Sequence, residues 1–192
     1  MIIKMNIEQT VEQIIDLYKK YGGSDYIGEN LTQLEHMTKA AMLAEEYGET
    51  ETIILACFLH DIGHLIEINS ESMKMGNLGV LNHESIGREY LLNHGFSQEL
   101  ANLVGNHVRS KRYLVTKFPN YINKLSDASR QTLKYQNNYM SADEMTEFEN
   151  DLSFADSLKI RFYDDQSKIV TRELKPLDYY RRLMINHLKN NC

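Results

Sequence analysis

The sequence contains few cysteines and prolines, and no tryptophan. Of the 192 residues, two are cysteines, two are prolines and ten are glycines. Cys57 and Cys192 have no chelating spacing, which excludes a disulfide scaffold and a cysteine-based metal site and fits a reducing cytoplasm. So few prolines and glycines argue against linkers, and one domain over residues 1–192 is expected.

Long apolar runs and an excess of positive charge are also missing. No apolar run approaches the length of a membrane-spanning helix, and residues 1–4 lack the pattern of a signal peptide. The formal net charge is −6, which argues against a nucleic-acid surface. We therefore expect a cytoplasmic protein without nucleic-acid or membrane partners. A local basic pocket for a small anion stays compatible with this charge, and the oligomeric state is open.

Helical periodicity dominates the chain, and only Ile169–Val170 looks extended. The pattern predicts an all-α, compact bundle of short antiparallel helices around one core. Asn82 is a plausible N-cap, and residues 67–81 are interpreted as a loop. Helices are expected over 7–20, 32–47, 51–64, 82–95, 97–107, 121–135, 141–152, 154–162 (closed by Asp164–Asp165) and from Pro176 through Leu188.

The most informative stretch is an apolar run followed by polar residues. Residues 53–59 are almost entirely apolar and predict a buried helix, which the sequence His60-Asp61-Ile62-Gly63-His64 ends. The two histidines are four residues apart and share a helix face. Buried polar groups cost free energy unless they are satisfied, and a metal would satisfy these. The alternative is one hydrogen-bonded core histidine with the remaining polar groups on the surface.

Five of the seven histidines lie near helix ends or at the polar end of the buried helix, whereas His94 and His187 sit in exposed-looking contexts. Imidazoles with interspersed carboxylates and no cysteine suit iron, manganese, cobalt, nickel or zinc, whereas magnesium alone would want more oxygen ligands. These ligands are too many for one ion, which suggests two metals sharing the two oxygens of Asp61. The five are His36, His60, His64, His83 and His107.

Two further groups of residues have open interpretations. Arg109, Lys111 and Arg112 follow His107 and either complement a helix C-terminus or face an anion. Tyr26 and Glu29 lie in a loop, where function concentrates, but composition alone favours a packed aromatic and a solvated charge.

The pattern His36, His60-Asp61 and Asp164 resembles the HD-domain superfamily, an all-helical fold of metal-dependent phosphohydrolases. His83 and His107 resemble its dinuclear branches. Over residues 25–188 the chain is similar, segment by segment, to one narrower group. This group comprises the mixed-valent di-iron oxygenases that cleave the carbon–phosphorus bond of 1-hydroxyalkylphosphonates, with myo-inositol oxygenase a distant cousin. The similar segments are 25–29, 33–36, 59–64, 107–115, 125–130 and 158–161.

The resemblance implies a division of labour within a metal-binding core of about residues 26–165. An Fe(II)/Fe(III) pair would be the cofactor and O2 the co-substrate. One iron would be held by His36, His60, Asp61 and Asp164, and the other by Asp61, His83 and His107. The phosphonate would be held by Lys111, Ser129, Thr132 and Arg161, with His64 in the same shell. Tyr26 and Glu29 would face the amine end, and with His64 they form the expected catalytic set.

The expected substrate is a small organophosphonate of the 1-hydroxy-2-(trimethyl)aminoethylphosphonate type, giving phosphate and glycine or glycine betaine. The alternative is an HD phosphohydrolase acting on a phosphomonoester or nucleotide, and a third possibility is a degenerate HD fold that binds a partner. The loop from Glu67 to Leu81 could complete the pocket, and Phe162 and Tyr163 are candidate aromatic walls.

Overall fold

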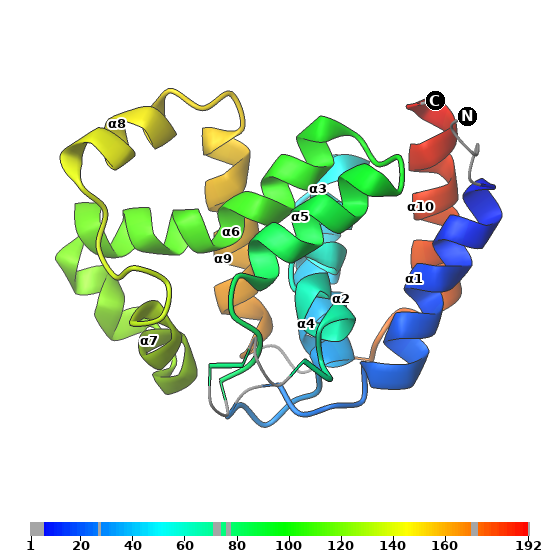
Figure 1. Cartoon of the computed structure of the whole chain (residues 1–192), viewed down its shortest axis with the longest axis horizontal. Helices are drawn as coiled ribbons and strands as arrows, with labels where there is room; N and C mark the ends of the chain where they lie inside the picture. The colour runs from blue at the N-terminus through cyan, green and yellow to red at the C-terminus, as the bar shows by residue number, and fades with distance from the viewer. Residues whose placement is uncertain (1–5, 27, 71–73, 76–77, 170–172, 192) are drawn as a thin grey trace.

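The computed structural model describes residues 6–26, 28–70, 74–75, 78–169 and 173–191. These residues form ten α-helices and one 3-10 helix (Figure 1), which confirms the predicted all-α fold. Their only β features are two isolated bridges, Asp25–Thr32 and Lys74–Val80. The elements are α1 (Ile7–Tyr21), α2 (Gln33–Glu46), α3 (Glu51–Leu59), α4 (Ile62–Ile66), α5 (His83–Asn93), α6 (Gln98–Lys117), η2 (Pro119–Lys124), α7 (Asp127–Leu133), α8 (Ala142–Glu149), α9 (Phe154–Ser167) and α10 (Leu177–Asn190).

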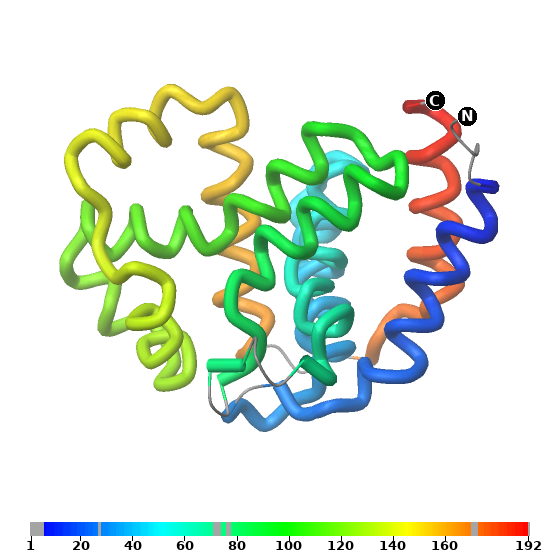
Figure 2. The backbone as a smooth tube through the Cα atoms, viewed as in Figure 1, coloured from blue at the N-terminus to red at the C-terminus, as the bar shows by residue number. Residues whose placement is uncertain are grey.

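Helix α3 lies at the centre of the molecule, and its residues 53–59 are all buried. It packs against α2, α6, α9 and α10, and α1 lies beside α10 on one side of the molecule (Figure 2). Phe58 stacks between Tyr18 of α1 and Tyr180 of α10, with ring centroids 4.4 and 4.0 Å away. The hydroxyl of Tyr18 also donates to the backbone C=O of Phe58. The terminal helices therefore fix the helix that leads into the polar motif.

The central helix is shorter than expected. It ends at Leu59, and α4 starts only at Ile62, with Asp61 between them at φ −103° and ψ 13°. The ring Nδ1 of His60 bonds to the C=O of Cys57 at 2.8 Å. In a continuous helix that carbonyl would accept the backbone N–H of Asp61. The prediction of one helix over 51–64 was therefore wrong at the residues that carry the metal chemistry.

Other helix boundaries also differ from the prediction. The largest difference is at α6, which continues to Lys117 and does not end near His107 as predicted, and α8 ends at Glu149, short of the expected 152. Residues 121–135 divide into η2 and α7, because the side chain of Ser126 accepts from Ser129 N–H and starts a new helix. Asn82 does not cap α5 with its side chain; its φ of 57° is left-handed, which asparagine tolerates well. Helix α9 continues to Ser167, beyond the expected end at Asp164–Asp165.

The last helix begins at Leu177, and Pro176 is its N-cap rather than its first residue. Ile169 lies in a turn, and Val170, the other residue expected to be extended, lies outside the described residues. His187 was expected to be exposed but is buried, and its Nε2 accepts the N–H of Ser97 at 3.3 Å. None of the described helices is long and apolar enough to cross a membrane.

Candidate metal centre

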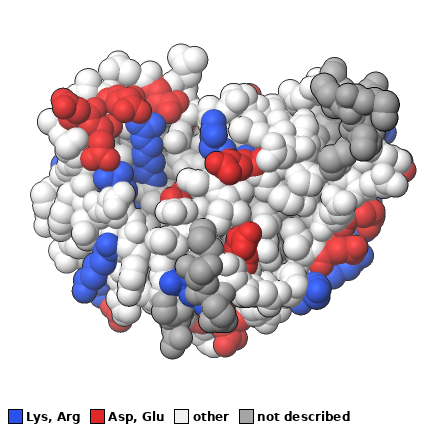
Figure 3. Space-filling view, viewed as in Figure 1, with Lys and Arg blue, Asp and Glu red and all other residues white. Residues whose placement is uncertain are grey.

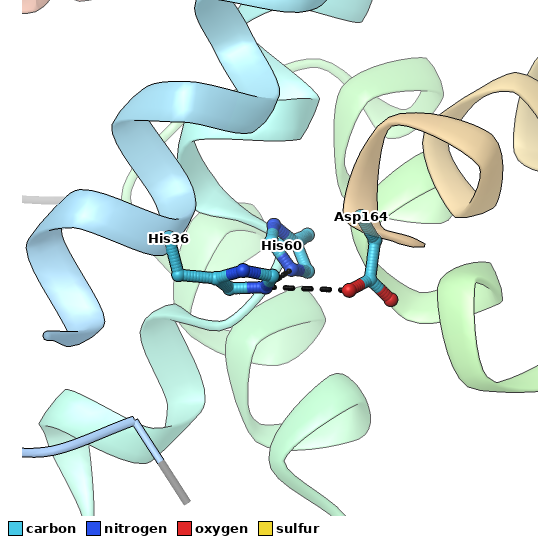
Figure 4. A group of neighbouring side chains, drawn as sticks. All are labelled: His36, His60 and Asp164. Atoms are coloured by element: carbon cyan, nitrogen blue, oxygen red, sulfur yellow. Dashed lines mark hydrogen bonds and ion pairs between the residues drawn. The ribbon is translucent and has the colours of Figure 1, made fainter. Parts of the chain in front are cut away.

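The six predicted metal ligands come together in the interior, although they lie far apart in the sequence. Their ligand atoms form two groups, each within 4.8 Å, and every member is buried. Figure 4 shows the first group, with His36 on α2 and Asp164 on α9 pointing toward His60 at the end of α3. The second group is Asp61, His83 at the start of α5 and His107 on α6.

Asp61 connects the two groups through its two carboxylate oxygens. Oδ2 lies 3.2 Å from His60 Nε2 and 3.5 Å from His36 Nε2. Oδ1 lies 3.3 Å from His83 Nε2 and 3.4 Å from His107 Nε2. Each oxygen therefore faces a different histidine pair, which is the geometry that a bridging carboxylate requires.

The spacing of the nitrogen atoms fits metal coordination. Nε2 of His36 lies 3.1 Å from Nε2 of His60, and Nε2 of His83 lies 3.0 Å from that of His107. An ion about 2.1 Å from each of two ligands separates them by roughly 3.0 Å when the angle between the bonds is about 90°. The donor set of four imidazoles and two carboxylates suits a borderline divalent cation. The residues therefore fit two metal ions.

All four histidines carry a hydrogen bond that orients the ring. A ring N–H donated from Nδ1 fixes the tautomer and leaves the Nε2 lone pair for a metal. Sequence reasoning had left these partners unassigned. They are the C=O of Cys57 for His60 (2.8 Å), the C=O of Val80 for His83 (3.1 Å), the C=O of Val104 for His107 (2.7 Å) and Ser167 Oγ for His36 (2.9 Å).

Both carboxylates of the centre are ionised. Burial alone would raise the pKa of Asp61, but protonated His60 and hydrogen bonds from the Nε2–H groups of neighbouring histidines hold it well below its usual value. A bound metal would displace these Nε2 protons. Burial acts in the same direction on the pKa of Asp164, which Arg161 and Lys168 lower well below its usual value. Ionised carboxylates are the form that binds metal.

A close backbone approach sets the position of His83. A Cβ on Gly63 would lie 2.0 Å from the backbone oxygen of His83, so only glycine lets α4 approach α5 this closely. The same approach places His64 against His83, with ring centroids 3.9 Å apart.

A cavity opens beside Asp61, His83 and His107. One end is lined by Lys111, Ser129 and Thr132, and Lys111 Nζ donates to Thr132 Oγ1 at 3.0 Å. Burial and then Arg161 lower the pKa of Lys111 to about 7. An anion bound there would favour the charged amine, so this end can accept a small anion.

Arg161 lines the same cavity and is paired inside the protein. It forms ion pairs with Asp164 and Asp165, and its Nη2 donates to Ser129 Oγ at 3.1 Å. It therefore links a predicted metal ligand to the anion end.

Tyr26, Glu29 and His64 also line the cavity. Tyr26 is buried and stacks on His36 with ring centroids 3.8 Å apart. It is therefore both a packed aromatic and a residue of the site. Glu29 Oε1 is buried and has no hydrogen-bond partner among the described residues.

His64 Nδ1 accepts the N–H of Val80 at 2.9 Å, and burial holds the pKa of His64 well below its usual value. Neutral His64 therefore carries its proton on Nε2.

Several residues weighed from the sequence lie elsewhere. Arg109 pairs with Glu147 and Asp151, and Arg112 pairs with Glu144. Figure 3 shows acidic side chains gathered over the α8 end of this face with basic side chains beside them. These two arginines therefore bind the carboxylates of α8 and its flank and do not face the cavity.

The proposed aromatic walls are also elsewhere. Phe162 is 42% exposed, and Tyr163 donates its hydroxyl to Glu49 at 2.8 Å. Both rings pack edge-on against Tyr47. Of the expected pocket loop 67–81, the described Met75 lines the cavity.

Sequence reasoning missed Gln136 and Lys168, which both line the cavity. Lys168 follows Asp164 by one turn and lies 3.2 Å from its Oδ1. Gln136 follows Thr132 by four residues, so the helical spacing 129, 132, 136 could have indicated it.

The fold and the paired site define a helical protein built around a candidate dinuclear metal centre. Comparison with protein families matches residues 33–161 to the HD domain, and the chain belongs to this family.

Three curated proteins are similar over most of the chain. Uncharacterized protein L432 of Acanthamoeba polyphaga mimivirus is 64% identical over 96% of this chain and 84% of its own length. The [1-hydroxy-2-(trimethylamino)ethyl]phosphonate dioxygenase (glycine-betaine-forming) of Leisingera caerulea is 34% identical over 93% of this chain and 89% of its own. Hydroxymethylphosphonate dioxygenase of Gimesia maris is 31% identical over 90% of this chain and 85% of its own.

Proposed function

We propose that this protein is a di-iron oxygenase that uses O2 to cleave the carbon–phosphorus bond of a 1-hydroxyalkylphosphonate, releasing phosphate and a carboxylate. The substrate would be of the 1-hydroxy-2-(trimethyl)aminoethylphosphonate type. The observation that carries this proposal is the position of Asp61, with one oxygen toward each histidine pair, beside a cavity that has a buried lysine at one end. Two relatives whose names describe phosphonate dioxygenases support it.

The ligand groups would hold the two irons as the resemblance implies. His36, His60, Asp61 and Asp164 would bind one iron, and Asp61, His83 and His107 the other. When bound, this Fe(II)/Fe(III) pair would supply Lewis acidity toward the substrate oxygens and the redox chemistry of O2.

The groups that line the cavity suit the two ends of the substrate. Lys111 and the hydroxyl of Ser129 would bind the phosphonate, because hydrogen bonds from charged donors to anions are the strong ones. The buried, unpartnered oxygen of Glu29 would accept an ammonium, or lie against a trimethylammonium as a counter-charge. Contacts to both the phosphonate and the amine would thus fix the carbon that loses its hydrogen.

Near the metal groups, His64 and Tyr26 would exclude water and orient the substrate. The Nε2–H of His64 is free of the backbone bond that its Nδ1 makes, so it can donate to an oxygen of the substrate. Tyr26 covers the ring of His36. The overall reaction balances: R–CH(OH)–PO3²⁻ plus O2 gives R–COO⁻, HPO4²⁻ and H⁺.

The test is to load the protein with iron, add ascorbate and offer (R)-2-amino-1-hydroxyethylphosphonate and its trimethylammonium analogue, with and without O2. Phosphate released only with O2, with equal O2 uptake, is the expected result. Equal hydrolysis of a phosphomonoester or nucleotide under nitrogen would instead identify a phosphohydrolase, in which the same groups would activate water. Absence of iron uptake would favour a degenerate fold that binds a partner.

A further inference from the structure

Most hydrogen-bond donors at the anion end of the cavity are already used within the protein. Thr132 donates its single hydroxyl hydrogen to the C=O of Ser129 at 3.1 Å. Lys111 donates to Thr132 Oγ1 at 3.0 Å and approaches the C=O of Ser129 at 3.4 Å. What these residues leave for a ligand is one N–H of Lys111 and the hydroxyl hydrogen of Ser129.

Arg161 keeps one uncommitted N–H, the second hydrogen of Nη1. Its Nη1 donates to Asp164, and its Nη2 donates to Ser129 Oγ and Asp165. Its Nε donates to Tyr121 Oη and Asp165 Oδ2, both at 3.2 Å. A phosphonate has three oxygens, each with lone pairs for more than one donor, so these residues alone leave it short of partners.

Lys168 also lines the cavity but is paired with Asp164, whereas Gln136 has an uncommitted oxygen. The side chain of Gln136 lines the same cavity and is only 9% exposed, and its Oε1 has no hydrogen-bond partner within the part of the chain that the structure describes. Leaving a buried carbonyl oxygen unsatisfied costs free energy, which a ligand that donates a hydrogen to it, such as a monoprotonated phosphonate, would recover. Gln136 lies in the turn after α7, where its N–H donates to the C=O of Leu133 at 3.1 Å, and its side chain lines the same cavity as Ser129 and Thr132.

We propose that Gln136 is a further substrate-binding residue, whose carboxamide binds an oxygen of the tetrahedral anion. This inference rests on the proposed function and adds a contact to it. A half-turn about the last side-chain bond exchanges the NH2 group and the oxygen at little cost. The NH2 group donates to an ionised phosphonate oxygen, and the oxygen accepts from a protonated one. The carboxamide thus completes a site that Lys111 and Ser129 leave open.

The test uses the full-length, iron-loaded protein without O2 and measures binding of inorganic phosphate and of methylphosphonate by calorimetry. Gln136→Met keeps the length of the side chain and removes its polar group. Gln136→Glu keeps the shape and adds a negative charge. Gln131→Met is the matched control, because Gln131 is an exposed glutamine five residues earlier.

We expect Gln136→Met to raise the Kd of both probes by about tenfold, as for one hydrogen bond to a charged group. Gln136→Glu should raise the Kd further, and Gln131→Met should leave it unchanged. A role confined to packing predicts the opposite order, because Glu matches the shape of Gln more closely than Met does.

Two outcomes overturn the inference and are distinguishable. If the wild-type protein binds both probes and Lys111→Met weakens binding, but both Gln136 variants bind like the wild type, only the role of Gln136 is wrong. If the wild-type protein binds neither probe, the anion end itself is wrong, and the proposed function falls with it.

Discussion

His64 and His83 stack on each other, and Val80 holds the two rings in opposite tautomers. The N–H of Val80 donates to Nδ1 of His64 at 2.9 Å, while its C=O accepts from Nδ1 of His83 at 3.1 Å. His83 therefore presents a lone pair at Nε2, and His64 presents a hydrogen. One backbone residue thus makes one histidine a metal ligand and its neighbour a hydrogen-bond donor.

The first prediction separates the two nitrogen atoms of His64. His64→Asn keeps an acceptor near Nδ1 for Val80 and removes the donor at Nε2. We expect kcat/KM of the phosphonate reaction to fall by about 10²–10³, the usual effect of losing one donor to a developing charge. The metal content should stay unchanged.

The matched variant is His64→Gln, which keeps a donor near Nε2 and loses the anchor to Val80. It should retain more activity than His64→Asn. Steady-state kinetics with metal analysis of both proteins checks this, and equal activity of His64→Asn and the wild type would rule out a donor role.

The second prediction concerns the close approach of α4 to α5. Gly63→Ala places a Cβ 2.0 Å from the backbone oxygen of His83, so the backbone must move. We expect a loss of stability of about 1–3 kcal/mol, as for overpacked interiors, and a lower metal content because His83 shifts from Asp61. Gly23→Ala is the control, since a Cβ there meets nothing within 4 Å. Thermal unfolding and metal analysis should distinguish the two variants.

The third prediction concerns the hydrogen bond behind His36. Ser167 Oγ lies 2.9 Å from His36 Nδ1 and donates to the C=O of Asp164 at 2.7 Å. Ser167→Ala should weaken one of the two metal sites by about 10–100-fold, because such bonds orient ligating histidines. Ser157→Ala changes an equally buried serine on the same helix, one that accepts from Asn106, and should leave both sites intact. Metal titration showing two unaltered sites in Ser167→Ala would contradict this.

The fourth prediction links Lys111 to pH. Its pKa is lowered to about 7, by burial first and then by Arg161, whereas in the unfolded chain it is about 10.4. Between these values the unfolded state binds a proton that the folded state does not, so this residue makes stability rise with pH from about 7 to 10. Lys111→Met should remove this rise.

The same variant should be more stable than the wild type near pH 7, by on the order of 2–4 kcal/mol, and should lose binding of phosphate. Thermal unfolding between pH 6 and 10, with calorimetry, measures both effects. A less stable Lys111→Met would show that the charged amine is well accommodated in the free protein.

Local patterns were enough to predict the all-α fold. Helices α2 and α8 begin with capping boxes, Thr32 with Glu35 and Ser141 with Glu144, and such a cap can be read from the sequence because its two residues are three positions apart. The break at His60–Asp61 could not be read in the same way. It accompanies the close approach of Gly63 to the backbone of His83, 20 residues away, which exists only in the folded chain.

The candidate site, like the fold, could be predicted only in part. The residue types and spacing of His60 and Asp61 pointed to a metal, and the resemblance supplied the partners from other helices. Glutamine is common on protein surfaces, so nothing in composition singled out Gln136. His187 was predicted to be exposed. Its burial could not be read from its neighbours in the sequence, because its hydrogen-bond partner, Ser97, is 90 residues away.

The position of the cavity walls has a consequence for substrate choice. The histidines and aspartates of the centre lie on helices or at helix ends, whereas the wall at the Tyr26 end comes from loop residues, Tyr26, Glu29 and Met75. Replacement of Glu29 would not disturb helix packing, whereas Tyr26 also stacks on His36 of α2. Under the proposed function, descendants of one ancestral scaffold could therefore exchange the groups that face the amine while the iron-binding interior is inherited intact.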